Sequence, residues 1–310
     1  MIGLSQIIKG LQHPHLAFRA LNRRYHYRKN GTDYNTAGTD IFNEDWDNLI
    51  LLDACRYDLF KKANQIEGRL EKRESRGSDT VEFLRGNFRE RILHDTVYIT
   101  ASPMLYRHRQ DINVEFHKIV DIWNNGGWSE EEMTVLPQPV TEAAIEAAER
   151  YPNKRLFVHY LQPHYPFVGS DNRPFRGGDA FVDRGRGSWT RIAMGEIETT
   201  RADVWNAYRD NLEYVLKSVS VLVNTLGGKT VVTSDHGNLL DERGFPILIR
   251  EWGHPRGLHV PDLVSVPWFV IEDKKRREIV SELPETAPVT EADASTVKER
   301  LARLGYADAD

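Results

Sequence analysis

The stretch from Asn48 to Phe60, NLILLDACRYDLF, constrains the fold more than any other part of the chain. Four consecutive aliphatic residues, Leu49 to Leu52, are typical of a strand that is buried on both faces, as in a parallel sheet. Asp53 follows at the carboxyl end of this strand, where open α/β sheets bind their ligands. Because residues Ala54 to Lys62 predict a helix, we expect Asp53 to lie in the mouth between strand and helix.

A second apolar run of the same kind occurs far downstream. Thr230 to Val232 predicts a buried strand, and the chain continues as TSDHG, which places Asp235 and His236 just past the strand end. Carboxylate and imidazole groups together suit a divalent cation. We therefore expect Asp53, Asp235 and His236 to hold one divalent metal ion, with Mn²⁺, Zn²⁺, Mg²⁺ and Ca²⁺ as the candidates.

The segment ESRGSDTVEFLRGNF, residues 74–88, contains two candidate nucleophilic hydroxyl groups. Ser78 or Asp79 can cap a helix that begins near Val81. A hydroxyl at a helix N-terminus meets unpaired N–H groups and the positive end of the helix dipole. A bound metal lowers the pKa of such a hydroxyl, so that it can attack a phosphoryl or sulfuryl group. Both Ser78 and Thr80 are candidates, and a simple N-cap is the structural alternative.

Histidines follow a third predicted strand. The segment RLFVHYLQPHYPF, residues 155–167, indicates a buried strand that runs into a proline-rich loop containing His164. We expect His164, or His254 further along the chain, to steady the transferring group or to protonate the leaving oxygen. His159 lies within the strand itself, and we interpret it as a core residue.

The remaining patterns complete an α/β protein. The apolar spacing predicts helices over residues 139–150, 201–226 and 290–304 and strands over 96–100 and up to Ile271, whereas residues 113–135 give no clear assignment. We predict a mostly parallel central sheet flanked by helices in three layers. The expected organisation is a basic N-terminal arm (1–45), a catalytic domain (46–275) and a C-terminal helical tail packed on that domain (276–310).

Charge and composition narrow the functional classes. A formal net charge of −5 argues against general nucleic-acid binding, and a single cysteine excludes an internal disulfide. The chain has no apolar run of membrane-spanning length and no signal-peptide pattern, so we expect a cytoplasmic protein. Residues 1–30 carry six basic and no acidic residues. This arm predicts peripheral contact with the inner membrane face, or else a helix packed on the domain with its basic side in water. No oligomeric state follows from the sequence.

Five stretches, in their order along the chain, resemble the alkaline phosphatase superfamily and in particular its sulfatase-like branch. They are LILLDACRYD, SRGSDTVEF, HYLQPHYPF, VVTSDHGN and WGHPRGLHVPDLVSVPWFV, and they cover roughly residues 46–275. The resemblance implies the three-layer fold of that superfamily. It also implies that the nucleophile's oxygen, here Ser78, joins Asp53, Asp235 and His236 as a metal ligand. His164 and His254 are implied at the substrate, with His259 as a competitor.

The nucleophile segment departs from that of the hydrolytic sulfatases. Their Cys-x-Pro-Ser-Arg element is absent, because the segment SDTVEF lacks its proline and arginine, and Cys55 is too close to Asp53 to replace it. The spacing is instead similar to that of lipoteichoic-acid synthases and related phosphoglycerol transferases, which have a Thr-Ser-Asp-Ser-Glu-Phe segment. An ungapped comparison puts Ser78 in the place of the nucleophilic threonine, and Thr80 stays a candidate.

These features predict a metal-dependent hydrolase or transferase that acts on a phosphate or sulfate ester through a Ser/Thr nucleophile. The basic arm and an arginine-rich loop at residues 173–186 indicate an anionic substrate, a glycan or a lipid head group. We also assign Arg56 to substrate binding. The alternative is a catalytically inactive protein of the same fold that binds an anionic glycan or a membrane-associated partner.

Overall fold

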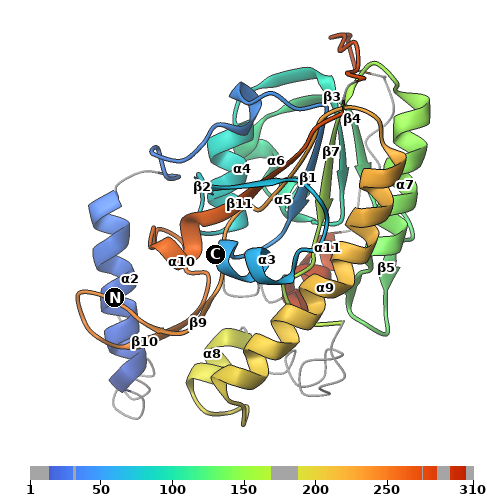
Figure 1. Cartoon of the computed structure of the whole chain (residues 1–310). Helices are drawn as coiled ribbons and strands as arrows, with labels where there is room; N and C mark the ends of the chain where they lie inside the picture. The colour runs from blue at the N-terminus through green and yellow to red at the C-terminus, as the bar shows by residue number, and fades with distance from the viewer. Residues whose placement is uncertain (1–13, 31–32, 169–187, 274, 285–293, 305–310) are drawn as a thin grey trace.

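The centre of the molecule is a seven-stranded sheet (Figure 1). The computed structural model describes residues 14–30, 33–168, 188–273, 275–284 and 294–304. The strand order is β2-β11-β8-β1-β7-β3-β4. The strands span β1 (Asn48–Leu52), β2 (Arg69–Glu74), β3 (Ile92–Thr100), β4 (Glu115–Asp121), β7 (Arg155–Tyr160), β8 (Thr230–Thr233) and β11 (Ser265–Ile271).

The sheet is mostly parallel. Strand β1 runs parallel to both neighbours, β7 and β8, and β3 runs parallel to β7 and β4. Only β11 within this sheet pairs in antiparallel fashion, with β8 on one side and β2 on the other. All five residues of β1 are buried, because the strand lies in the middle of the sheet with both faces covered. This position explains its uninterrupted aliphatic run.

Helices lie on both sides of the sheet, as Figure 1 shows for α7 and α9 on one side and α4, α5 and α6 on the other. The mixed α/β architecture predicted from the sequence is confirmed. The helices span α2 (Pro14–Asn30), α3 (Tyr57–Ala63), α4 (Thr80–Phe88), α5 (Met104–Arg107), α6 (Arg109–Ile112), α7 (Pro137–Arg150), α8 (Ser188–Ala193), α9 (Arg201–Thr225), α10 (Pro261–Val264) and α11 (Ala294–Arg303). None of these described helices combines the length and the apolar character needed to span a membrane.

Helix α9 is the longest described helix, and local signals define both of its ends. The Thr200 hydroxyl accepts a hydrogen bond from the Asp203 amide (3.2 Å), and the Asp203 carboxylate accepts one from the Thr200 amide (3.0 Å). This reciprocal cap satisfies two amides that a helix start leaves unpaired. The helix ends before Gly227 and Gly228, and Gly228 has a φ of +94°, a conformation that favours glycine.

Two short hairpins were not predicted from the sequence. They are β5 (Trp128–Ser129) with β6 (Thr134–Val135), and β9 (Leu239–Arg243) with β10 (Arg250–Gly253). Their strands are two to five residues long and show no regular alternation of apolar and polar residues, so periodicity could not identify them. At the C-terminal end of the described chain, α11 contributes Val297 and Leu301 to the main hydrophobic core.

Candidate active site

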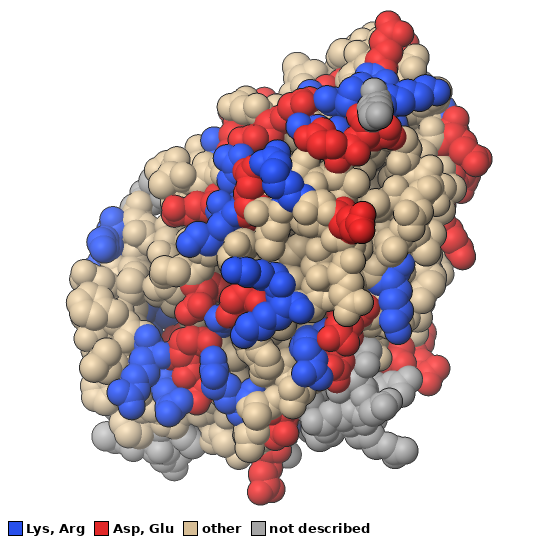
Figure 2. Space-filling view, in the orientation of Figure 1, with Lys and Arg blue, Asp and Glu red and all other residues tan. Residues whose placement is uncertain are grey.

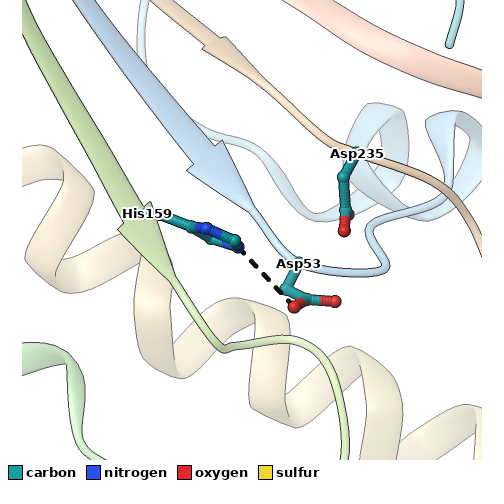
Figure 3. A group of neighbouring side chains, drawn as sticks. All are labelled: Asp53, His159 and Asp235. Atoms are coloured by element: carbon teal, nitrogen blue, oxygen red, sulfur yellow. Dashed lines mark ion pairs between the residues drawn. The ribbon is translucent and has the colours of Figure 1, made fainter. Parts of the chain in front are cut away.

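The carboxyl ends of β1, β7 and β8 meet at one edge of the sheet, because these strands are adjacent and parallel. Asp53 directly follows β1, Asp235 lies two residues past β8, and His159 belongs to β7. Figure 3 shows the three side chains converging from these separate elements. All three are buried, and one ligand atom of each lies within 4.8 Å of the others. The two carboxylates that the sequence predicts at one site are therefore close in space.

His236 and Thr80 complete this cluster. The Nε2 atom of His236 lies 3.6 Å from Asp53 Oδ1 and 3.3 Å from Asp235 Oδ2. The same Nε2 atom lies 3.3 Å from the hydroxyl oxygen of Thr80, the first residue of α4. Both residues are fully buried. The described structure thus brings two carboxylates, two imidazoles and a hydroxyl together at a helix N-terminus.

A tight turn after β1 aims the Asp53 side chain. Ala54 has a φ of +58°, which is unusual for a residue with a side chain and costs on the order of 1 kcal/mol or more. The turn is held by the Ala54 amide, which donates to Asp235 Oδ1 (2.9 Å), and by the Cys55 amide, which donates to the Ser234 hydroxyl (2.8 Å). The expected helix therefore begins at Tyr57 rather than Ala54.

Two side chains of helix α9 form hydrogen bonds with the loops at this edge of the sheet. The Tyr208 hydroxyl donates to the Ala54 carbonyl and accepts from the Arg56 amide (3.1 Å). Further along the same helix, the Asn211 amide donates to the carbonyls of Pro163 and His164 (3.1 Å each). One helix thus fixes both the turn after Asp53 and the loop that carries His164.

The two central carboxyl groups have opposite pKa shifts. Burial raises the pKa of Asp235, and the negative charge of Asp53 raises it further. Burial acts in the same direction on Asp53, but the nearby imidazoles, led by His164 and His159, hold the pKa of Asp53 below its ordinary value. Two carboxylates therefore lie close together in a buried space, and the cluster contains no lysine or arginine side chain.

His236 presents a lone pair to this space when it is neutral. Its Nδ1 atom lies 2.7 Å from the Gly237 carbonyl, which can only accept, so Nδ1 carries the hydrogen. The Nε2 lone pair then faces the Asp53 and Asp235 carboxylates. Burial lowers the pKa of His236, but these two carboxylates outweigh burial and raise it above its ordinary value. The ring needs a positive charge between it and the carboxylates, either a proton or a metal ion.

The cluster fits a divalent cation on this evidence. Among the described residues, Asp235 Oδ2 accepts no hydrogen bond although it is buried, which is costly unless another positive group satisfies it. Two carboxylates and an imidazole are suitable ligands for Mn²⁺ or Zn²⁺, and a hydroxyl oxygen can join them. Asp53, His159 and Asp235 are close enough together to hold such an ion, and His236 and Thr80 lie beside the two carboxylates.

Ser78, which we expected as the nucleophile and metal ligand, is directed elsewhere. Its hydroxyl lies 2.8 Å from a Glu82 carboxylate oxygen and 3.1 Å from the Pro255 carbonyl. Asp79 caps α4, accepting from the Glu82 amide (2.8 Å), so the helix starts at Thr80. The start of the helix thus presents the Thr80 hydroxyl to His236, and the structure favours Thr80, the second candidate from the sequence.

Glu82 ties α4 to the loop that follows β10. Its carboxylate accepts from the Ser78 amide (2.8 Å), the Gly257 amide (2.9 Å) and His259 Nε2 (3.2 Å). Burial raises the pKa of Glu82, but the hydrogen bonds from His259 and Ser78 outweigh it and lower the pKa. His259 therefore links Glu82 of α4 to the loop that carries His254.

His164 and His254 form a pair beside the cluster. Their Nε2 atoms are 3.0 Å apart, and the His254 ring centroid lies 4.6 Å from that of His236. Burial lowers the pKa of both His254 and His164. The structure thus places the two histidines that the sequence analysis assigned to the substrate next to each other and next to His236.

Arg56, which the sequence analysis assigned to substrate binding, makes its hydrogen bonds within the protein. Its guanidinium group donates to Asp58, Glu242, Asp262 and the Asn238 carbonyl at 2.8 to 3.2 Å. A guanidinium group has five N–H donors, and these contacts occupy all five. Arg56 therefore braces α3 against the residues around β9 and α10 and has no donor left for a substrate.

We expect Arg56→Ala to lower the free energy of unfolding by about 2–4 kcal/mol, because it leaves partly buried carboxylates without their shared cation. Urea denaturation measures this loss. Arg201→Ala is the matched control, since Arg201 also pairs with Glu242 but is 54% exposed, and its loss should cost less than about 1 kcal/mol. An Arg56→Ala protein of unchanged stability but raised KM would restore the substrate role.

His159, which the sequence analysis interpreted as a core residue, is fully buried and also lies beside Asp53. Its Nδ1 atom is 2.7 Å from the Tyr98 hydroxyl, and its Nε2 atom is 3.6 Å from Asp53 Oδ2. In the register of the sheet, His159 pairs with Leu51, two residues before Asp53. Knowing that β7 adjoins β1 would have revealed this position, but strand order is not encoded in local sequence.

Comparisons with known proteins give structural matches only. Neither a protein-family model nor a curated protein sequence matches the chain. It is similar to the soluble domain of lipooligosaccharide phosphoethanolamine transferase A from Neisseria meningitidis, with 13% identity, a TM-score of 0.46 and coverage of 73% of this chain and 76% of that chain. It is similar to the C-terminal periplasmic domain of phosphoethanolamine transferase EptC from Campylobacter jejuni, with 12% identity, a TM-score of 0.44 and coverage of 73% and 78%.

A third match is a protein in the alkaline phosphatase superfamily from Vibrio parahaemolyticus, with 14% identity, a TM-score of 0.33 and coverage of 69% of this chain and 45% of that chain. The superfamily named there is the one that the five sequence stretches resemble.

Proposed function

We propose that the protein is a metal-dependent phosphoryl or sulfuryl transferase or hydrolase that uses Thr80 as its nucleophile. One observation carries the proposal: Asp53, Asp235, His236 and the Thr80 hydroxyl converge in a buried space from parts of the chain up to 183 residues apart, from 53 to 236. Groups at this separation have no local reason to meet. Their chemistry matches that of a cation-assisted attack by a hydroxyl group.

The bound cation would supply charge neutralisation and a lower pKa for the hydroxyl. In the attack, a bond forms between Thr80 Oγ1 and the phosphorus or sulfur atom, and the bond to the ester oxygen breaks. Thr80 loses one proton and the leaving oxygen gains one. The step therefore needs a group that carries a proton between the two oxygens, but no net gain or loss of protons. The His164–His254 pair lies beside Thr80's partner His236 and is placed to be that carrier. Water or an acceptor hydroxyl then attacks the phosphorus or sulfur atom, and the bond to Thr80 Oγ1 breaks. The proton that the attacking oxygen loses restores the Thr80 hydroxyl.

The position of Thr80 favours an anionic group at this point. It is the first residue of α4, where helix amides and the dipole favour negative charge. Phosphoethanolamine transferases are among the structurally similar proteins, and we propose an ester of the same general class, on a glycan or a lipid head group, as the substrate of this chain.

Turnover of chromogenic esters tests the proposal. We expect release of 4-nitrophenol from a 4-nitrophenyl phosphate, a bis(4-nitrophenyl) phosphate or a 4-nitrophenyl sulfate in the presence of Mn²⁺ or Zn²⁺, loss of turnover with a chelator, and recovery when the metal is returned. The preferred ester identifies the class of group that is transferred. Absence of turnover on all three esters with every metal would instead favour the inactive anion-binding alternative.

A further inference from the structure

Helix α2 is fastened to the β9–β10 hairpin through one of its faces. Arg19 and Arg23 both donate to the buried Glu251 carboxylate, at 2.6 and 2.9 Å. Asn22 donates to the Ile247 carbonyl, and His26 contacts the Phe245 carbonyl, each at 2.7 Å. Figure 1 shows the helix and the hairpin side by side at one end of the molecule. A helix packed on the domain was one of the two alternatives that the sequence left open for this arm, and the hairpin that it contacts was not predicted.

A second face of α2 exposes large apolar side chains. Phe18, Leu21 and Tyr25 are 45%, 55% and 41% exposed, and their spacing of three and four residues puts them on one stripe of the helix. At the tip of the attached hairpin, Phe245 and Leu248 are 61% and 70% exposed. Five large apolar side chains from two neighbouring elements are therefore open to solvent, which a soluble surface rarely shows without a partner.

The same helix is strongly basic. Its 17 residues include five arginine or lysine residues and no acidic residue. Glu251 neutralises two of the five, and the other three, Arg24, Arg28 and Lys29, are exposed and make no ion pair with a described residue. Figure 2 shows lysine and arginine side chains beside both uncharged and acidic surface over the region of α2 and the hairpin. We call these three cations and the five exposed apolar side chains the apolar-basic face.

We propose that the apolar-basic face docks the protein on an anionic lipid bilayer. Apolar side chains beside arginine and lysine are the combination that binds the interface of such a membrane, since the apolar groups enter the acyl boundary and the cations meet lipid phosphates. A protein partner of matching shape would need acidic groups opposite the three cations, whereas an anionic bilayer supplies them at any orientation of the helix.

One end of α2 is linked to the loop that carries His254. Strand β10 ends at Gly253, one residue before His254. Asn30, the last residue of α2, donates to the Gly257 carbonyl in the loop that follows (2.6 Å). A docked protein would therefore hold this loop near the lipid surface. The inference does not depend on the reaction, because membrane binding is measured without turnover.

Flotation of the full chain with lipid vesicles tests the inference. We expect binding to vesicles of equal parts phosphatidylcholine and phosphatidylglycerol, and little binding to phosphatidylcholine alone. The triple variant Arg24→Gln, Arg28→Gln, Lys29→Gln should bind about 100-fold more weakly. The double variant Phe245→Ser, Leu248→Ser should lose at least about 10-fold. Val221→Ser is the control, because Val221 is a 50% exposed apolar residue on α9, away from the face.

Thermal unfolding of each variant shows that it remains folded, since all the substituted side chains are exposed. Two outcomes would overturn the inference. One is binding of equal strength to both kinds of vesicle, with no change in the triple or the double variant. The other is a dimer in light scattering that the double variant abolishes while no vesicle binding is seen, which would assign the face to a second copy of the chain.

Discussion

Thr80→Ala is expected to lower kcat for the preferred ester at least about 10³-fold, the scale of effect seen when a nucleophile is removed. Thr80 is the one hydroxyl of the two candidates that touches the cluster, at 3.3 Å from His236 Nε2. Its loss removes the atom that would bond to the transferred group. The substitution itself is small and the helix keeps its Asp79 cap, so the variant should remain folded.

The matched controls separate the two hydroxyls. Ser78→Ala should retain turnover within about 10-fold of the wild type, with a loss of stability of roughly 1–3 kcal/mol because Glu82 loses a donor. Thr80→Ser keeps an oxygen in place and should retain more activity than Thr80→Ala. Kinetic assays of the three proteins decide the matter. Full activity in Thr80→Ala together with an inactive Ser78→Ala would return the role to Ser78.

Asp235→Asn is expected to raise the stability of the metal-free protein and to remove the stabilisation by metal. In the metal-free protein it removes a buried negative charge next to Asp53, and its new N–H group can donate to the His236 Nε2 lone pair, now 3.3 Å from Asp235 Oδ2. We expect the metal-free variant to be more stable than the wild type by about 1–2 kcal/mol. The Asn oxygen can still accept from the Ala54 amide.

Added metal, in contrast, should stabilise the wild type far more than the variant. The wild type should gain about 2.7 kcal/mol at a metal concentration 100 times the Kd, while Asp235→Asn should gain almost nothing. Thermal unfolding with and without Mn²⁺ or Zn²⁺ measures both effects. Asp111→Asn, at a carboxylate 40% exposed and paired with surface arginines, should keep the full metal response. A shared ion site would be contradicted if Asp235→Asn were less stable than the wild type without metal and gained as much stability from metal as the wild type does.

Sequence reasoning found the two strand ends because a buried parallel strand has a clear local pattern. The aliphatic run before Asp53 and the β-branched run before Asp235 each indicate a central strand. Parallel strands then bring both carboxyl ends to one edge of the sheet, which the structure confirms. This much follows from residues within a few positions of each aspartate.

What the sequence missed depends on contacts between distant residues. The choice between Ser78 and Thr80 depends on which residue begins α4, a boundary that helix patterns locate only to within a few positions. The contacts of Arg56 include, besides its neighbour Asp58, the carboxylates of Glu242 and Asp262, which reach it only in the folded chain. The exposed apolar tip of the β9–β10 hairpin was missed for a different reason, because neither strand has a regular alternation of apolar and polar residues.

The most direct measurement is diffraction from crystals soaked in Mn²⁺, recorded near the manganese absorption edge. The account predicts one strong anomalous peak within about 2.0–2.4 Å of oxygens of both Asp53 and Asp235 and of His236 Nε2, and no such peak in crystals of Asp235→Asn. A map without a peak between Asp53 and Asp235 at saturating Mn²⁺ and Zn²⁺, or with metal bound only at other residues, would contradict it.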